Sequence, residues 1–246
     1  MTDFNEFERP LSPEKETGSV IAHAWENYKK VILYGILLFI GMSMVSSLIT
    51  SIFQHIMGIP ANDPELMKEI MKTKNYHLLI NSPGFTSNIS ISYIVGLFLY
   101  PMYAGFLYLI HKANNNQSLS FGDLFIGYKQ NTAQIILYGL ITGIITGIGF
   151  ALCVLPGIIL GTMLFLGLPI VFFENKTAIE GIQKSFEICK NNFWTILGIA
   201  FLSVLISLSG VLLCCIGIVI TLLFVFASMY SAYCAYCGTP YEVEKA

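Results

Sequence analysis

The placement of the charged residues limits most strongly how this chain can fold. Four long stretches contain no Asp, Glu, Lys or Arg: residues 31–62, 78–110, 131–173 and 191–241. A helix needs about 20 apolar residues to cross a hydrocarbon layer ~30 Å thick. Charged residues make up 11% of the 246 residues, against roughly 25% in soluble domains. This composition excludes an ordinary soluble domain and a disordered chain, and the net charge of −2 excludes binding of nucleic acid through a basic surface.

The pattern therefore predicts an all-α polytopic membrane protein with six transmembrane helices. Pro156-Gly157 divides the third stretch, and Cys214-Cys215-Ile216-Gly217 divides the fourth. The predicted spans are residues 31–53, 89–110, 132–155, 157–173, 193–213 and 216–235. We expect residues 1–18 to form a flexible acidic tail, residues 19–237 the transmembrane domain, and residues 238–246 a C-terminal tail. If the fourth stretch were one span, the C-terminus would lie on the opposite side of the membrane.

The basic residues predict the orientation. With six spans, ten of the thirteen Lys and Arg residues lie on the side of the N-terminus, and only Lys68, Lys72 and Lys74 lie in the first outer loop. Cytoplasmic loops carry the excess of Lys and Arg, so both termini are predicted to be cytoplasmic. In the outer loop, Asp63 and Pro64 predict the start of a short helix.

A short amphipathic segment precedes each odd-numbered span, over residues 19–30, 120–129 and 177–190. Each segment has an aromatic residue followed one turn later by lysine, which predicts a helix lying flat at the cytoplasmic surface. Together the segments predict three units, each an amphipathic helix followed by a helical hairpin; the alternative is ordinary helices flanking membrane spans. The aromatic and lysine pairs are Trp25 and Lys29, Phe125 and Lys129, and Phe186 and Lys190. The pairs Ser120/Asp123 and Thr177/Glu180 predict capping boxes at the second and third segments.

A stripe of glycines predicts close helix packing. Small residues at every fourth position let helix backbones approach closely, within one protein or between copies, and a channel lined by these glycines is the alternative. Pro101 and Pro169 lie inside predicted spans and predict kinks. The glycine stripe consists of Gly139, Gly143, Gly147, Gly157 and Gly161.

The histidines, cysteines and acidic residues do not form a recognisable metal-binding or catalytic motif. Two histidines, His23 and His111, are predicted to be cytoplasmic and His55 and His77 to be outside, so the four cannot share one metal ion. We expect no metal, no cofactor and no catalytic residue. The spacing of Cys234 and Cys237 is interpreted as packing, whereas Cys153 could pair with Cys214 or Cys215 near the outer face. Glu174 follows the fourth span, and a structural role for it is favoured.

A set of short motifs extends along the chain. Its members are Leu155-Pro156-Gly157-Ile158-Ile159-Leu160, Pro169, Glu174, Ala178, Ser185 and Trp194, together with Ala24-Trp25 and Phe121-Gly122-Asp123-Leu124-Phe125. The set resembles a bacterial integral-membrane family that includes the membrane domain of glycerophosphoryl diester phosphodiesterases and the YciC-like inner-membrane proteins. The outer loop, residues 54–88, is longer than the family leads us to expect. The resemblance implies about six spans and a bacterial inner membrane, and it offers no catalytic residues to carry over.

These features favour a non-enzymatic membrane protein with a structural or accessory role. Its expected partners are the lipid bilayer and either a second copy or another membrane protein, and no nucleic acid. The main alternative is a transporter or a lipid-handling protein. The third hypothesis is a membrane enzyme that uses Glu174 and His111.

Overall fold

The computed structural model describes residues 12–58, 64–73, 75, 82–210 and 221–240. Regular structure within these ranges is entirely helical. The chain forms two compact units: residues 1–37 with 101–246, and residues 38–100.

The smaller unit contains the second half of α1 (Thr17–Met57), α2 (Pro64–Thr73) and the first part of α4 (Pro83–Asn114). Helix α2 begins at Pro64, as the sequence predicts, although Asp63 lies outside the described residues. Large apolar side chains of α1 stay exposed, among them Met44 at 61%, Leu48 at 60% and Ile56 at 74%. Such surface is costly in water and is favourable in a bilayer.

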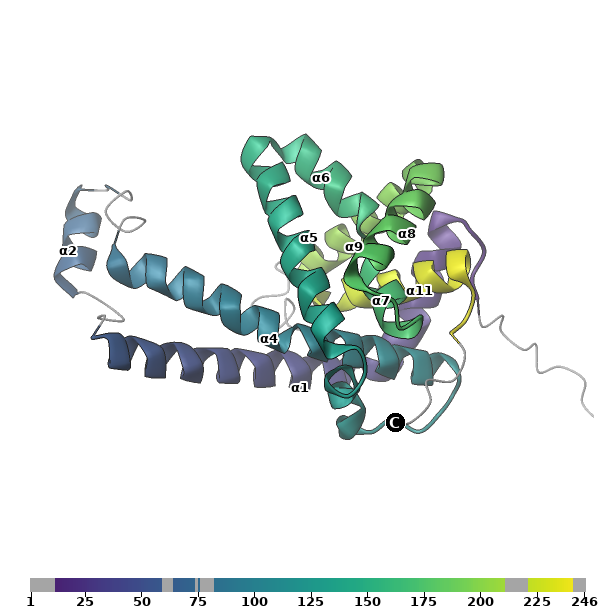
Figure 1. The fold of residues 1–246 in the computed structure, drawn as a ribbon, viewed down its shortest axis with the longest axis horizontal. Helices are drawn as coiled ribbons and strands as arrows, with labels where there is room; N and C mark the ends of the chain where they lie inside the picture. Colours follow the sequence, from purple (N-terminus) through teal and green to yellow (C-terminus); the bar gives the residue numbers. More distant parts are fainter. Residues whose placement is uncertain (1–11, 59–63, 74, 76–81, 211–220, 241–246) are drawn as a thin grey trace, which may run out of the picture. The chain divides into compact units, whose positions relative to one another are not determined.

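The larger unit contains the remaining elements (Figure 1). They are the first part of α1, the last part of α4, a 3-10 helix η1 (Phe121–Tyr128), α5 (Thr132–Leu152), α6 (Val154–Met163), α7 (Gly167–Phe173), α8 (Ala178–Asn191), α9 (Phe193–Ser209) and α11 (Phe224–Cys237). Helices α5 and α6 form a hairpin, and α7 packs against α8. Aromatic side chains fill the centre of this unit, and Tyr28, Phe106, Phe172, Phe224 and Tyr230 are fully buried.

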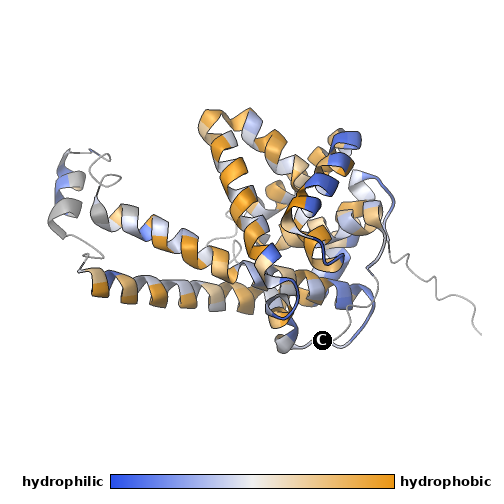
Figure 2. Ribbon diagram, viewed as in Figure 1, coloured by the Kyte–Doolittle hydropathy of each residue, from blue (hydrophilic) through white to orange (hydrophobic). Residues whose placement is uncertain are grey.

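Four helical segments are long and apolar enough to cross a membrane: Thr17–Met57, Ser87–Asn114, Thr132–Leu152 and Val154–Phe173. Helices α8 and α9 meet at 105° and would make a fifth if the bent pair counts as one span. Figure 2 shows the apolar character of the α5–α6 hairpin beside the more polar α8. The protein thus has an all-helical architecture with four or five candidate spans among the described residues. The predicted division at Cys214–Gly217 lies outside them.

Two predicted boundaries between helical segments differ from the structure. The segment 19–30 and the span 31–53 form one continuous helix, α1, without a break. The turn between α5 and α6 lies at Cys153 instead of Pro156-Gly157. Pro156 is the third residue of α6, where an amide hydrogen has no intrahelical acceptor, so proline is tolerated there without breaking the helix.

The end of the predicted tail is held in place. Ser12 Oγ donates to the Cys234 carbonyl over 2.6 Å, and Thr17 Oγ1 donates to the Thr195 carbonyl over 3.3 Å. Lys15 Nζ lies 5.6 Å from the centre of the Tyr236 ring. Residues 12–17 of the predicted tail therefore pack on α9 and α11, and residues 1–11 lie outside the described part.

The amphipathic segments each bury part of their apolar face and expose the aromatic residue that precedes the lysine. Ala24 is fully buried while Trp25 is 44% exposed. In η1, Leu124 and Gly127 are buried, whereas Phe125 is exposed. In α8 the buried residues are Ala178, Gly181, Ser185 and Cys189, and Phe186 is exposed. Each predicted apolar face therefore has a protein-facing part, which in the first segment includes Tyr28, and an outward aromatic residue.

Candidate functional site

The candidate span Val154–Phe173 is broken in its middle. Helix α6 ends at Met163 and α7 begins at Gly167, so the three residues between them are not helical. Pro169 is the third residue of α7, where its missing amide hydrogen leaves no helical bond unmade. The predicted kink at Pro169 is thus the start of a new helix.

Side chains from α5 and α8 form hydrogen bonds with the backbone of this break. The Tyr138 hydroxyl donates to the Leu164 carbonyl over 2.7 Å. Ser185 Oγ donates to the Met163 carbonyl over 2.8 Å and accepts from the Leu166 amide over 3.2 Å. Tyr138 is 3% exposed and Ser185 is fully buried. Backbone groups freed by the break are therefore bonded within the protein, as an apolar surrounding requires.

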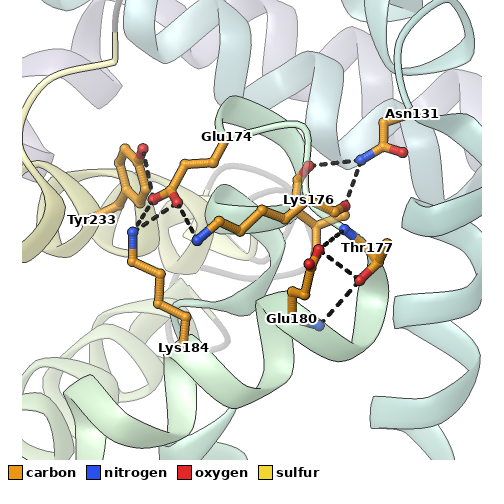
Figure 3. Close-up of polar contacts among 8 residues, drawn as sticks. Asn131, Glu174, Lys176, Thr177, Glu180, Lys184 and Tyr233 are labelled. Carbon is orange, nitrogen blue, oxygen red and sulfur yellow. Dashed lines mark hydrogen bonds and ion pairs between the residues drawn. The ribbon is translucent and has the colours of Figure 1, made fainter.

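A charged cluster lies directly after α7, formed by Glu174, Lys176, Lys184 and Tyr233 (Figure 3). Lys184 Nζ lies 2.6 and 2.7 Å from the two carboxylate oxygens of Glu174, and Lys176 Nζ lies 3.1 Å from Oε2. The Tyr233 hydroxyl donates to Glu174 Oε1 over 3.4 Å. Partial burial alone raises the pKa of the Glu174 carboxyl, but the two lysines outweigh it and hold the pKa below its ordinary value. Glu174 is therefore an ionised anchor between α7, α8 and α11.

The turn from α7 to α8 is fixed from both sides (Figure 3). Asn131 adopts a left-handed backbone with φ 54°, and its Nδ2 donates to the carbonyls of Val171 and Lys176 over 2.9 and 2.7 Å. At the start of α8, Thr177 and Glu180 form the predicted capping box. These bonds satisfy the end of α7 and the start of α8.

A buried polar network joins α1, α4 and α11. His23 Nε2 lies 2.9 Å from Asn114 Oδ1, and His23 Nδ1 lies 2.9 Å from Ser231 Oγ. Asn114 Nδ2 donates to the Tyr230 hydroxyl over 3.3 Å, and that hydroxyl lies 3.0 Å from His111 Nδ1. His23 and His111 thus share one network through Asn114 and Tyr230. Within the described ranges, no three His, Cys, Asp or Glu residues are placed to hold a metal ion.

The 3-10 helix η1 is wedged against α4. A Cβ added to Gly105 would overlap the Leu124 backbone, and one added to Gly127 would overlap the Pro101 carbonyl. Lys112 Nζ lies 2.7 Å from Asp123 Oδ2, and Asp123 also closes the predicted capping box with Ser120. Two glycines and one ion pair therefore fix η1 along the last part of α4.

The glycine stripe is divided between packed and open positions. Gly139 and Gly157 are buried. A Cβ on Gly147 or Gly161 would meet no atom within 4 Å. Gly149, which the stripe does not include, also packs against α6: a Cβ there would lie 3.0 Å from the Gly157 Cα atom. The packing role of the open glycines, towards another helix or another chain, stays a prediction.

The motif residues of the second half gather around the α6–α7–α8 region. Ser185 closes the break, Glu174 pairs with the two lysines, and the buried Ala178 donates its amide to Gln134 Oε1 over 3.0 Å. Trp194 differs, since it is 81% exposed. Sequence reasoning missed Tyr138 and Asn131 as partners of this region. The pair Gly167 and Pro169 could have signalled the new helix, because proline is accepted in a first turn.

Comparisons with known proteins returned no match to a family model, a curated protein or a solved structure. The resemblance to the bacterial membrane family therefore stays a prediction. The predicted pairing of Cys153 with Cys214 or Cys215 falls on residues outside the described part, while Cys153 itself is exposed.

Proposed function

We propose that this chain is a non-enzymatic integral membrane protein with a structural or accessory role, embedded in a bacterial inner membrane with both termini cytoplasmic. The four or five apolar helical segments support membrane insertion. The resemblance to the membrane domains and inner-membrane proteins named above is consistent with this role. In this proposal its partners are the bilayer and a second copy or another membrane protein.

The closed break in Val154–Phe173 carries the proposal. In many transporters, the unwound part of a broken span offers backbone groups and helix ends to the substrate or ion. Here Tyr138 and Ser185 bind the groups that such a site would offer. The break therefore serves better as a rigid joint than as a binding site.

The main alternative, a transporter or a lipid-handling protein, would use the break as a hinge, and the bonds of Tyr138 and Ser185 oppose such a movement. The hypothesis of a membrane enzyme is less well supported. Glu174 contacts two lysines, and His111 contacts Tyr230, so neither is placed as a partner of the other by the bonds described. Native mass spectrometry of gently extracted protein distinguishes these hypotheses. A solute, or one lipid molecule of a single species that stays bound at fixed stoichiometry in an excess of other lipids, would favour the alternative. Phospholipids bound in variable number at the surface would not.

A pair of glycine variants tests assembly directly. Gly147 lies on open surface of α5, so Gly147→Leu should leave the single chain as stable as before, or up to ~1 kcal/mol more stable from helix propensity. If the open stripe contacts another chain, the variant should lose its oligomer or its partner in native mass spectrometry. Gly149→Leu is the matched control, because Gly149 packs within the chain and its substitution should lower thermal stability instead. An unchanged assembly in a well-folded Gly147→Leu protein would overturn the role of the stripe.

A further inference from the structure

We infer that η1 is an interfacial anchor whose aromatic side inserts into the headgroup layer of anionic phospholipids. The inference rests on the proposed membrane location and adds the lipid class and the residues that meet it. Phe121, Phe125 and Tyr128 are 50%, 41% and 40% exposed. Their rings are in contact, with centroids 5.9 Å apart from Phe121 to Phe125 and 6.5 Å apart from Phe125 to Tyr128. They form one continuous outward surface, called here the aromatic ledge.

The position of η1 on α4 sets the depth of the ledge. At one end, Asp123 pairs with Lys112, which lies just beyond the charge-free stretch that ends at residue 110. At the other end, Gly127 contacts Pro101, which lies inside that stretch. The short helix therefore straddles the point where α4 changes from apolar to charged. That point belongs at the membrane–water boundary, where aromatic side chains are enriched.

The short connections of η1 to α4 and α5 also place η1 at the membrane–water boundary. Residues 115–120 connect α4 to η1, and residues 129–131 connect η1 to α5. Because α4 and α5 both belong to candidate spans, η1 cannot move far from the surface between them. The ledge is also rigid, since a wedge of two glycines and an ion pair fixes the backbone behind it.

The charge next to the ledge selects the lipid. Asp123 is neutralised by Lys112, whereas Lys129 at the end of η1 is exposed. A lysine near the surface of an anionic membrane contributes ~1 kcal/mol. The same pairing of an exposed aromatic and an exposed lysine one turn later occurs at Phe186 and Lys190 and at Trp25 and Lys29, although Lys29 also pairs with Glu26 over 2.9 Å. A repeated arrangement of this kind fits phospholipid phosphates better than one protein partner.

Fluorescence quenching by brominated lipids tests the ledge. The full chain has two tryptophans, so Phe125→Trp in a Trp25→Phe, Trp194→Phe background gives a single probe. In vesicles of phosphatidylcholine and phosphatidylglycerol, bromines near the headgroup should quench this probe more strongly than bromines deep in the acyl chains. Quenching by aqueous iodide alone would place the ledge in water, and resistance to both quenchers would place a protein partner or a second copy on it. Either result would overturn the inference. Alkaline extraction of the same vesicles reports membrane insertion separately, so failure of the proposed function is distinguishable.

A lysine variant tests the lipid class. Lys129→Gln should reduce the excess of phosphatidylglycerol over phosphatidylcholine that native mass spectrometry finds on the released protein, by roughly fivefold at this site. Lys72→Gln is the control, because Lys72 is also exposed but lies on α2, in the predicted outer loop. Equal lipid ratios in the wild type and the Lys129→Gln variant would show that the ledge has no preference for anionic lipid.

Discussion

Two serines are both fully buried, but their hydroxyl groups have different structural roles. Ser203 bonds the Ile199 carbonyl of its own helix, α9. Ser185 instead bonds two backbone groups of another segment, the Met163 carbonyl and the Leu166 amide. A carbonyl within a helix already has a partner, whereas groups at a helix break do not. The hydroxyl of Ser185 therefore does what the helix itself cannot do there.

The Ser185→Ala variant should lose about 1–3 kcal/mol of stability, because it leaves buried backbone groups at the break without a partner. Ser203→Ala should cost much less, since the backbone bond of α9 remains. Thermal or detergent unfolding of both variants measures the difference. Equal losses would mean that Ser185 contributes only its volume and that the break is satisfied in another way.

The ion pairs of Glu174 make a prediction about pH. Because the pKa of Glu174 is lowered in the folded protein, its stabilising effect is present above the unfolded pKa, ordinarily 4.5, and is lost as the pH falls through the folded pKa. Glu174→Gln should therefore be less stable than the wild type at about pH 7, and the gap in melting temperature should narrow as the pH falls below 4.5. Glu187→Gln, on the exposed side of α8, is the control and should show a smaller gap. A gap that does not change with pH would contradict the ion-pair role.

Whether a side-chain hydrogen bond can be predicted from the sequence depends on how far apart its two residues lie along the chain. The capping boxes at Ser120 and Thr177 are recognisable in the sequence, because both partners lie within one turn. The bonds from Tyr138 to Leu164 and from Ser185 to Leu166 join residues 26 and 19 positions apart. No local pattern specifies such a pair, because it depends on how two helices meet.

At the level of elements, the packing of η1 on α4 depends on two glycines, because a methyl group at either position would overlap the facing backbone. Gly105→Ala and Gly127→Ala should each destabilise the protein by about 1–3 kcal/mol, because the added methyl would overlap the facing backbone. Neither glycine has a positive φ, so the effect is steric. Gly122→Ala is the matched control within η1, where the nearest atom to the new Cβ is Ser120 Oγ at 3.7 Å. Thermal unfolding compares the three, and a tolerated Gly127→Ala would show that η1 shifts freely on α4.

The amphipathic elements show where hydrophobic periodicity reaches its limit. Periodicity predicts that Phe121, Leu124, Phe125 and Tyr128 share one face, and in η1 Leu124 turns inward while the three aromatics turn outward. In a soluble protein the largest apolar side chains would point to the core. Beside a bilayer both sides of an element can be apolar, so the pattern identifies the element without identifying its inner side. The same reason explains the inward Gly181 and outward Phe186 of α8.

At the level of the whole molecule, sequence predicts the helical class and the spans up to residue 173 better than their joints. Apolar length is a local property, so each described candidate span overlaps a charge-free stretch. The continuous α1 and the break before Gly167 depend on neighbouring helices and are not encoded in length. Topology, which assigns each loop to one side of the membrane, follows from the lysine distribution and requires its own measurement.

Two cysteine probes measure that topology. Cys153 is exposed at the turn from α5 to α6, which the proposed topology places outside. In intact spheroplasts, a membrane-impermeant maleimide should label Cys153 in a variant whose other cysteines are alanine. Lys190→Cys in a cysteine-free chain is the counterpart: Lys190 is exposed near the end of α8, so its label should appear only after permeabilisation. Labelling of both before permeabilisation would place α8 and the α5–α6 turn on one side, which a crossing α6–α7 segment does not allow. The reversed pattern would keep the spans and invert the protein, moving the aromatic ledge to the outer leaflet.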